Sequence, residues 1–239
     1  LVAKDYAKAL EGFKEALTLA PACGEEGEEL VGTCKSVIPS IVLSIAKNEI
    51  KDSKYDEGIA GLEEAKCDVF RLPLDPAWTN DPNKQSDGKE SGEADISRFS
   101  QTRLKTYLRT LYFPIARRAM NHGMYVVVRP PGVCPGNLRV GDYYQDYLMT
   151  VWDTFTKNDS ILRYPGQISI ELANEPVSLK NAQGEDDPRA LHDYFQPIVD
   201  RIRTNGFTGI IWIPGTGWQA NYASYAVHPT EGYNIGYAR

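Results

Sequence analysis

The chain has 239 residues, of which 42% are hydrophobic, and its formal net charge at pH 7 is −6. This length suits one large domain or two modest ones, and the composition is normal for a soluble globular protein. The acidic balance argues against nucleic acid as the main partner. No apolar run reaches the ~20 residues that span a bilayer, so the sequence predicts no membrane partner either.

The first residues, Leu1 to Tyr6, show neither a signal peptide nor an initiator methionine. We therefore expect the chain to be the interior of a longer sequence. The 4 cysteines and 3 histidines are scattered, with no Cys-x-x-Cys among them. This spacing predicts no metal site, and nothing else in the sequence calls for a cofactor.

Residues 1–66 hold most of the negative charge and predict a helical segment. From Tyr6 to Leu19 the apolar residues are spaced by three and four, which indicates a helix with one buried face. A second helix is expected from about residue 25 to 50, and a third begins at Tyr55. The β-branched run around Pro39 is also compatible with a strand, but we favour a helix that is kinked there.

Two parts of this segment resemble the second helix of a tetratricopeptide repeat. Asp5, Tyr6, Ala9, Phe13, Ala16 and Pro21 carry the first resemblance, and Lys54, Tyr55, Ile59, Leu62 and Ala65 carry the second. The two copies lie further apart than the usual ~34 residues, and fewer than two full repeats are present. The resemblance implies a surface for a protein partner. The other interpretation is simply a packed helical hairpin.

Residues 67–74 form a short apolar run that predicts a buried strand, with Arg71 inside it. A buried arginine needs a carboxylate partner, so Arg71 belongs either to a structural ion pair or to an active-site clamp. Residues 75–95 predict a long loop, and loops of that length are usually functional or mobile. Trp78, near its start, is either a sugar platform or packing for the loop.

The rest of the chain alternates between helical and strand patterns. We expect helices over residues 96–121, 142–155 and 190–203, with a division of the first near Pro114 and a polar loop over 180–188. Strands are expected over 124–128, 167–173 and 208–213, and another begins at Tyr233. His122 precedes a strand, away from the expected site, and is interpreted as a turn residue.

The strand over residues 167–173 ends in Asn174, Glu175 and Pro176. Proline lacks the N–H donor that would continue the strand, so Asn174 and Glu175 are expected at its carboxyl end. In an α/β barrel the catalytic groups sit at that end. A carboxylate beside an amide that can bind a sugar hydroxyl suits general acid/base catalysis.

Strands that alternate with helices indicate a parallel sheet with helical crossovers, hence an α/β fold. Both a (β/α)8 barrel and a doubly wound sheet fit this pattern. No Gly-x-Gly-x-x-Gly follows the first strand, which disfavours a nucleotide-binding sheet. The expected strand ends carry side chains that suit a carbohydrate cleft: Arg71, Trp78, Arg129, Asn174, Glu175, Trp218 and Tyr222.

This region resembles glycoside hydrolase family 5, the cellulase and mannanase group with a (β/α)8 barrel. The residues that carry the resemblance are Val69-Phe-Arg71-Leu-Pro, Leu172-Ala-Asn174-Glu175-Pro176, Ile211-Trp-Ile-Pro-Gly-Thr-Gly-Trp218 and Tyr233-Asn-Ile-Gly-Tyr237. They are similar to strands two, four, five and six of that barrel. The third strand departs from the pattern, because Arg129-Pro-Pro stands where the family often has a histidine.

The resemblance implies a retaining β-glycanase that acts on a β-linked polysaccharide or oligosaccharide, with Glu175 as acid/base, Asn174 binding the sugar 2-hydroxyl and Arg71 beside the nucleophile. Trp78, Arg129, Trp218 and Tyr222 are the expected substrate-binding residues. The family's nucleophile belongs to strand seven, which is expected beyond residue 239. The chain alone is therefore expected to hydrolyse β-1,4-glucans negligibly.

The sequence thus predicts two parts, a helical segment over residues 1–66 and an incomplete barrel of about strands two to six over 67–239. We expect the parent protein to be secreted or at the cell surface. The alternative hypothesis is a non-catalytic interaction module, in which the helices bind a protein partner and the barrel is a remnant. A third is that the 239 residues are an incomplete or composite part of a larger enzyme.

Overall fold

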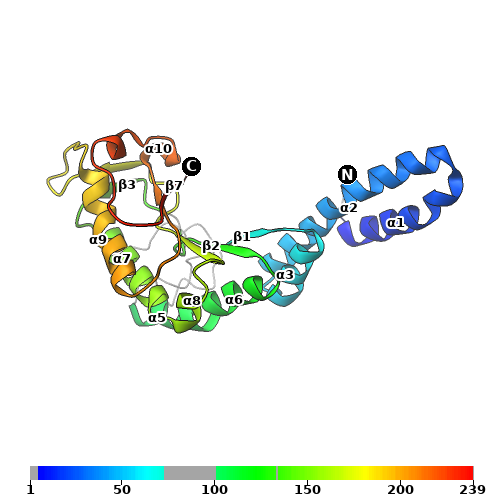
Figure 1. Ribbon diagram of the computed structural model, residues 1–239, viewed down its shortest axis with the longest axis horizontal. Coiled ribbons are helices and arrows are strands. Elements are labelled where there is room, and N and C mark those ends of the chain that lie inside the picture. The colour runs from blue at the N-terminus through cyan, green and yellow to red at the C-terminus, as the bar shows by residue number, and fades with distance from the viewer. Residues whose placement is uncertain (1–4, 73–100, 133, 239) are drawn as a thin grey trace. The chain divides into compact units, whose positions relative to one another are not determined.

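The structure is a computed structural model that describes residues 5–72, 101–132 and 134–238 (Figure 1). Its contacts divide the chain into two units. The first is Leu1–Phe70 together with Arg118–Met124, and the second is Arg71–Arg117 together with Tyr125–Arg239. Trp78 and the predicted loop over 75–95 lie outside the described residues.

The first unit is helical, as predicted. It contains α1 (Tyr6–Leu19), a 3-10 turn η1 (Ala20–Cys23), α2 (Glu25–Lys51) and α3 (Tyr55–Glu64). Asp5 caps α1 by accepting a hydrogen bond of 3.1 Å from the Lys8 amide. Gly24, at φ 67°, separates η1 from α2. The run around Pro39 is helical, so the choice of helix over strand there is confirmed.

Small residues let α3 pack closely on α2. A Cβ on Gly58 would lie 2.9 Å from the Ala46 carbonyl oxygen, and one on Gly61 would lie 2.9 Å from the Ala46 Cβ. Leu62 and Ile59 are buried in this contact, whereas α1 has no fully buried residue. The end of α6 (Phe113–Asn121) joins the unit through His122, whose Nδ1 lies 2.5 Å from Glu63 Oε2. His122 is thus a turn residue, as expected.

One helix among the described residues, α2, is long and apolar enough to cross a membrane by length and composition alone. This finding does not overturn the expectation from the sequence, which concerned a continuous apolar run of ~20 residues, because polar residues such as Lys35 and Ser36 interrupt α2. In the structure α2 packs against both α1 and α3. A helix that packs in a protein core passes the same test, so this finding carries no assignment to a membrane.

The second unit is built on a parallel sheet in the order β1-β2-β4-β6-β7. The strands are β1 (Val69–Leu72), β2 (Tyr125–Val128), β4 (Ile168–Glu171), β6 (Ile211–Pro214) and β7 (Ile235–Ala238). β2 pairs with β4, β4 with β6 and β6 with β7, each in parallel. The predicted parallel series is confirmed, and the helices between the strands make it the (β/α)8 type of arrangement.

The two faces of the sheet differ in polarity. One face carries apolar side chains that are fully buried: Val126, Val128, Ile168, Ile170, Ile211 and Ile213. Helices α7 (Tyr143–Thr156) and α9 (Ala190–Thr204) supply further buried side chains to this core. Because side chains alternate along a strand, the other face carries Val127, Ser169, Glu171, Trp212 and Gly236, which the strand register places side by side. This second face holds the polar residues of the site.

Three predicted elements differ in detail. The helix before β2 is divided into α5 (Gln101–Tyr107) and α6 by a π-helical turn, η4 (Leu108–Tyr112), rather than at Pro114 itself. The proline ring clashes with the carbonyl four residues earlier, and a π-helical turn at that place relieves the clash. The strand predicted from residue 208 begins at Ile211, and the predicted loop over 180–188 starts inside a strand, β5 (Ser178–Lys180).

β5 pairs in parallel with β3 (Asn137–Arg139) to form a separate two-stranded ribbon. The other short elements are helix α8 (Asp159–Leu162), helix α10 (Thr216–Gln219) and the 3-10 turn η5 (Ala223–Ala226). The cysteines are all free thiols, with Cys23 exposed and Cys34 buried.

Candidate active site

The carboxyl end of β4 presents Glu175 on a strained backbone. The Leu172 amide still donates to the Trp212 carbonyl at 3.0 Å, and the Leu172 carbonyl accepts from the Trp152 indole at 3.0 Å. Beyond this point the chain leaves the sheet, and Glu175 adopts φ 51°. The left-handed conformation costs a non-glycine residue about 1–2 kcal/mol. Such strain clusters at functional sites, where surrounding contacts maintain it.

Arg71 on β1 links the strand ends of β1 and β4. Its Nε and Nη2 atoms donate to the two carboxylate oxygens of Glu171 at 2.8 and 2.7 Å. Nη2 also donates to the Asn174 side-chain oxygen at 2.9 Å. The Asn174 oxygen is thereby occupied, so its NH2 group is left to donate to a ligand.

The charge of Arg71 is secured by its surroundings. The pKa of its guanidinium is raised, first by the hydrogen bond to Glu171 and then by the negative charges of Glu171 and Glu175, which outweigh the desolvation. The Glu171 side chain is only 5% exposed, whereas that of Arg71 is 44% exposed. Arg71 therefore forms an ion pair with Glu171 and also holds the side chain of Asn174. Of the two interpretations left open by the sequence, the ion pair is present, and the role in an active site stays a prediction.

Glu171 and Gln219 were missed by the sequence-based prediction. Gln219 is buried, and its Nε2 atom donates to Glu171 Oε1 at 3.2 Å. The preceding turn is fixed to the segment after Glu175, because the Gly217 amide donates to the Val177 carbonyl at 2.8 Å and the Trp218 amide to the Pro176 carbonyl at 3.0 Å. The strict alternation of β4, which places Glu171 on the same face as Ser169, is the signal that would have identified Glu171.

Buried aromatic donors hold the carboxyl ends of the strands. The Tyr112 hydroxyl contacts the carbonyl oxygens of Leu72 and Arg129, which end β1 and follow β2. The Tyr225 hydroxyl donates to the Pro214 carbonyl at the end of β6 at 3.0 Å. Burial raises the pKa of Tyr112 well above its usual value, so the hydroxyl keeps its proton and remains a donor.

The other predicted site residues lie as follows. Arg129 is half-buried next to Arg71, and its pKa is lowered, first by desolvation and then by the charge of Arg71. Its Nε atom is buried and has no hydrogen-bond partner among the residues that the structure describes. Trp218 is 68% exposed, and Tyr222 packs edge-on against Tyr237 with ring centres 6.2 Å apart. Within residues 5–72, 101–132 and 134–238, no group of three or more His, Cys, Asp or Glu is placed to hold a metal.

The parallel sheet with its polar carboxyl edge defines a protein of the α/β-barrel class. Comparison with known families narrows this class to one family, because the family model described as "Cellulase (glycosyl hydrolase family 5)" matches residues 35–238. The chain therefore belongs to glycoside hydrolase family 5. The resemblance inferred from the sequence is confirmed, and the described strands are part of the family's (β/α)8 barrel. A search of curated proteins finds no match.

Among solved structures, one supports the same fold and two others are similar at a lower score. A β-glucanase from Saccharophagus degradans is similar with a TM-score of 0.52 and 16% identity, over 80% of this chain and 52% of that one. The catalytic domain of the endoglucanase Cel5A of Thermobifida fusca gives a TM-score of 0.49 and 18% identity, over 77% and 52%. A structure described as "endoglucanase" gives 0.47 and 16%, over 75% and 50%. The chain spans about half the length of these structures.

Proposed function

We propose that the chain carries the acid/base half of a retaining endo-β-1,4-glycanase. The observation that carries this proposal is the hydrogen bond of 2.9 Å from Arg71 to the Asn174 amide oxygen, directly before Glu175 on its strained backbone. This bond orients the NH2 group of Asn174 as a donor next to the exposed carboxyl group of Glu175. Membership of a cellulase family supports β-1,4-linked glucan as the substrate class.

In this proposal each residue has a distinct role. Glu175 donates a proton to the leaving glycosidic oxygen and then takes one from the attacking water, as the acid/base of a retaining enzyme does. The Asn174 NH2 group binds the 2-hydroxyl of the sugar, because its oxygen is held by Arg71. The exposed Trp218 ring, together with Arg129 and Tyr222, provides substrate contacts at the same edge of the sheet. Trp78, which lies outside the described residues, stays a predicted substrate-binding residue.

The retaining mechanism also needs a nucleophilic carboxylate about 5–5.5 Å from the acid/base. Glu171 is a poor candidate, since Arg71 and Gln219 already donate three hydrogen bonds to its oxygens. We therefore propose that the nucleophile lies on a part of the protein outside these 239 residues. We also propose that the parent protein works outside the cell, where a polymeric glucan is accessible.

The test is the release of reducing sugar from a soluble β-1,4-glucan by the 239-residue chain and by a longer version that contains the whole barrel. Each is compared with its Glu175→Gln variant. We expect negligible release by the short chain, clear release by the longer version, and a loss of about 10²–10⁴-fold on substitution. Strong, Glu175-dependent turnover by the short chain would place the second carboxylate within these residues and refute this assignment.

A further inference from the structure

A cleft of about 540 Å³ lies between α9 and the segment that leads into β7. On the helix side it is lined by Arg189, the N-cap residue of α9, and by residues three and four apart on one face of the helix: His192, Gln196, Val199 and Arg203. The opposite wall is formed by Glu231, Gly232 and Tyr233. The volume is that of a site for a small ligand, which is typically about 300–1,000 Å³.

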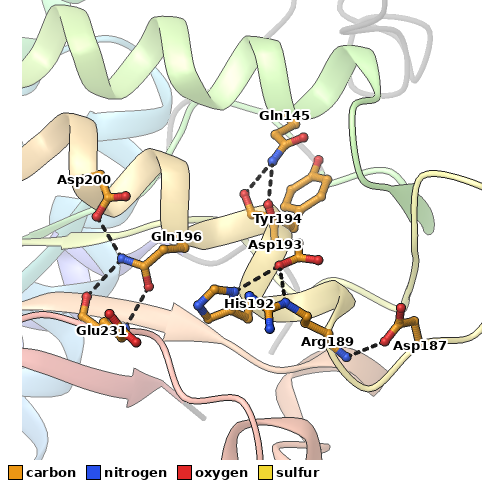
Figure 2. Close-up of polar contacts among 9 residues, drawn as sticks. All are labelled: Gln145, Asp187, Arg189, His192, Asp193, Tyr194, Gln196, Asp200 and Glu231. Atoms are coloured by element: carbon orange, nitrogen blue, oxygen red, sulfur yellow. Dashed lines mark hydrogen bonds and ion pairs between the residues drawn. The ribbon is translucent and has the colours of Figure 1, made fainter.

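The wall of the cleft is held in place by side chains of α9. Gln196 binds both backbone groups of Glu231, accepting from its amide at 2.7 Å and donating to its carbonyl at 3.1 Å, and it also donates to Asp200 at 2.8 Å (Figure 2). Arg203 donates to the Tyr233 carbonyl at 2.6 Å and to the Phe207 carbonyl at 2.7 Å. A wall fixed in this way is preorganised, which lowers the entropic cost of binding a ligand.

Tyr233 supplies an aromatic surface. Its side chain is among the exposed large hydrophobic groups, at 52% exposure, and the Arg203 guanidinium lies 4.4 Å from its ring centre. The guanidinium covers one face of the ring, so the opposite face is left for a ligand. Among the described residues the Tyr233 hydroxyl and the Glu231 carboxylate make no hydrogen bond, which leaves both for a ligand's hydroxyl groups.

The charges of the cleft disfavour an anionic ligand. Arg189 is paired with Asp193 at 3.0 Å, and Arg203 is occupied by backbone carbonyls. Asp200 and Glu231 add negative charge to the lining. An uncharged ligand that combines an apolar ring face with hydroxyl donors matches this surface, and a sugar ring has both.

We propose that this cleft is a second saccharide-binding site, which takes a short stretch of the glucan chain away from Glu175. The choice of glucan rests on the proposed function. Because Glu231, Gly232 and Tyr233 precede β7, whereas Glu175 follows β4, the two sites belong to opposite ends of the parallel strands. The second site would hold the polymer to the protein without taking part in the chemistry.

The experiment is a titration of the ¹⁵N-labelled 239-residue chain with cellotetraose, observed through the backbone amides. We expect the Gly232 amide signal to shift on addition, and Tyr233→Ala to weaken this binding about tenfold through loss of the ring surface. Glu231→Gln is the second variant, because it keeps the backbone groups that Gln196 binds and changes only the free carboxylate. It is expected to weaken the binding severalfold.

Tyr143→Ala is the matched control, since it removes an aromatic ring that is 40% exposed and belongs to neither proposed site, and it should leave the Gly232 titration unchanged. An unmoved Gly232 signal, or an affinity unaltered by both Tyr233→Ala and Glu231→Gln, would overturn the proposal. The two proposals fail separately. If the two variants weaken cellotetraose binding in the cleft but the longer version hydrolyses no glucan, only the glycanase function is refuted. If the longer version shows Glu175-dependent hydrolysis but the Gly232 signal does not move, only the second saccharide site is refuted.

Discussion

At the scale of single residues, the side chain and backbone of Glu171 link three elements of the fold. Its carboxylate accepts from Arg71 on β1 and from Gln219 on α10, while its own backbone belongs to β4. Arg71 in turn fixes Asn174. The orientation of the proposed sugar-binding amide therefore depends on a residue that is not itself expected to touch the substrate.

Replacing Glu171 by glutamine should destabilise the fold. Removing one partner of a fully buried ion pair costs about 3–5 kcal/mol. Because Arg71 is 44% exposed, water can solvate part of its charge, and we expect a loss of about 2 kcal/mol in the free energy of unfolding. Urea denaturation measures it.

The control for this substitution is Lys157→Gln. Lys157 forms an exposed pair with Asp153 on α7 at 2.7 Å, and breaking such a pair should cost at most about 0.5 kcal/mol. Equal losses for the two variants would show that the Glu171 network contributes no more than a surface contact.

At the scale of elements, the polar face of the sheet depends on a close approach between β6 and β7. The register places Trp212 opposite Gly236. A Cβ on Gly236 would lie 2.5 Å from two carbons of the Trp212 ring. Glycine at this position thus leaves room for the Trp212 indole, and Trp212 is itself the register partner of Glu171 on β4.

Gly236→Ala should therefore force the Trp212 ring to move. Overpacking of this kind costs about 1–3 kcal/mol, and we expect a lower midpoint of thermal unfolding together with a change in tryptophan fluorescence. Gly166→Ala is the control, because a Cβ there meets nothing within 4 Å. An unchanged midpoint for Gly236→Ala would contradict the packing described for this face.

Sequence patterns predicted most elements because their signals are local. The alternation of Ile168 and Ile170 identified β4, and the spacing of apolar residues identified α1, α7 and α9. The partner of Arg71 was not predicted, since Glu171 is 100 residues away in sequence and only the fold brings the two together. The β3–β5 ribbon has strands of 3 residues each, too short to give a periodic pattern.

At the scale of the whole molecule, the family match starts at residue 35, inside α2. The match therefore includes part of the helical region, which the sequence predicts to be a separate segment that ends at residue 66. The boundary at 66 and the likeness of the helices to tetratricopeptide repeats stay predictions. The catalytic account rests on the match as a whole, because the Asn-Glu pair and Arg71 both lie within it.

The central claim is that Glu175 protonates the leaving group. The most direct test compares two substrates, one whose leaving group needs a proton and one whose leaving group does not. In a version of the protein with the whole barrel, Glu175→Gln is assayed on cellotetraose and on a 2,4-dinitrophenyl β-glycoside of the same sugar. The alcohol released from cellotetraose needs protonation, whereas dinitrophenolate leaves without it. We predict a loss of about 10²–10⁴-fold on cellotetraose, with a burst of dinitrophenolate retained at nearly the unsubstituted rate. Equal losses in the bond-cleaving step of both substrates would contradict the assignment of Glu175 as the acid.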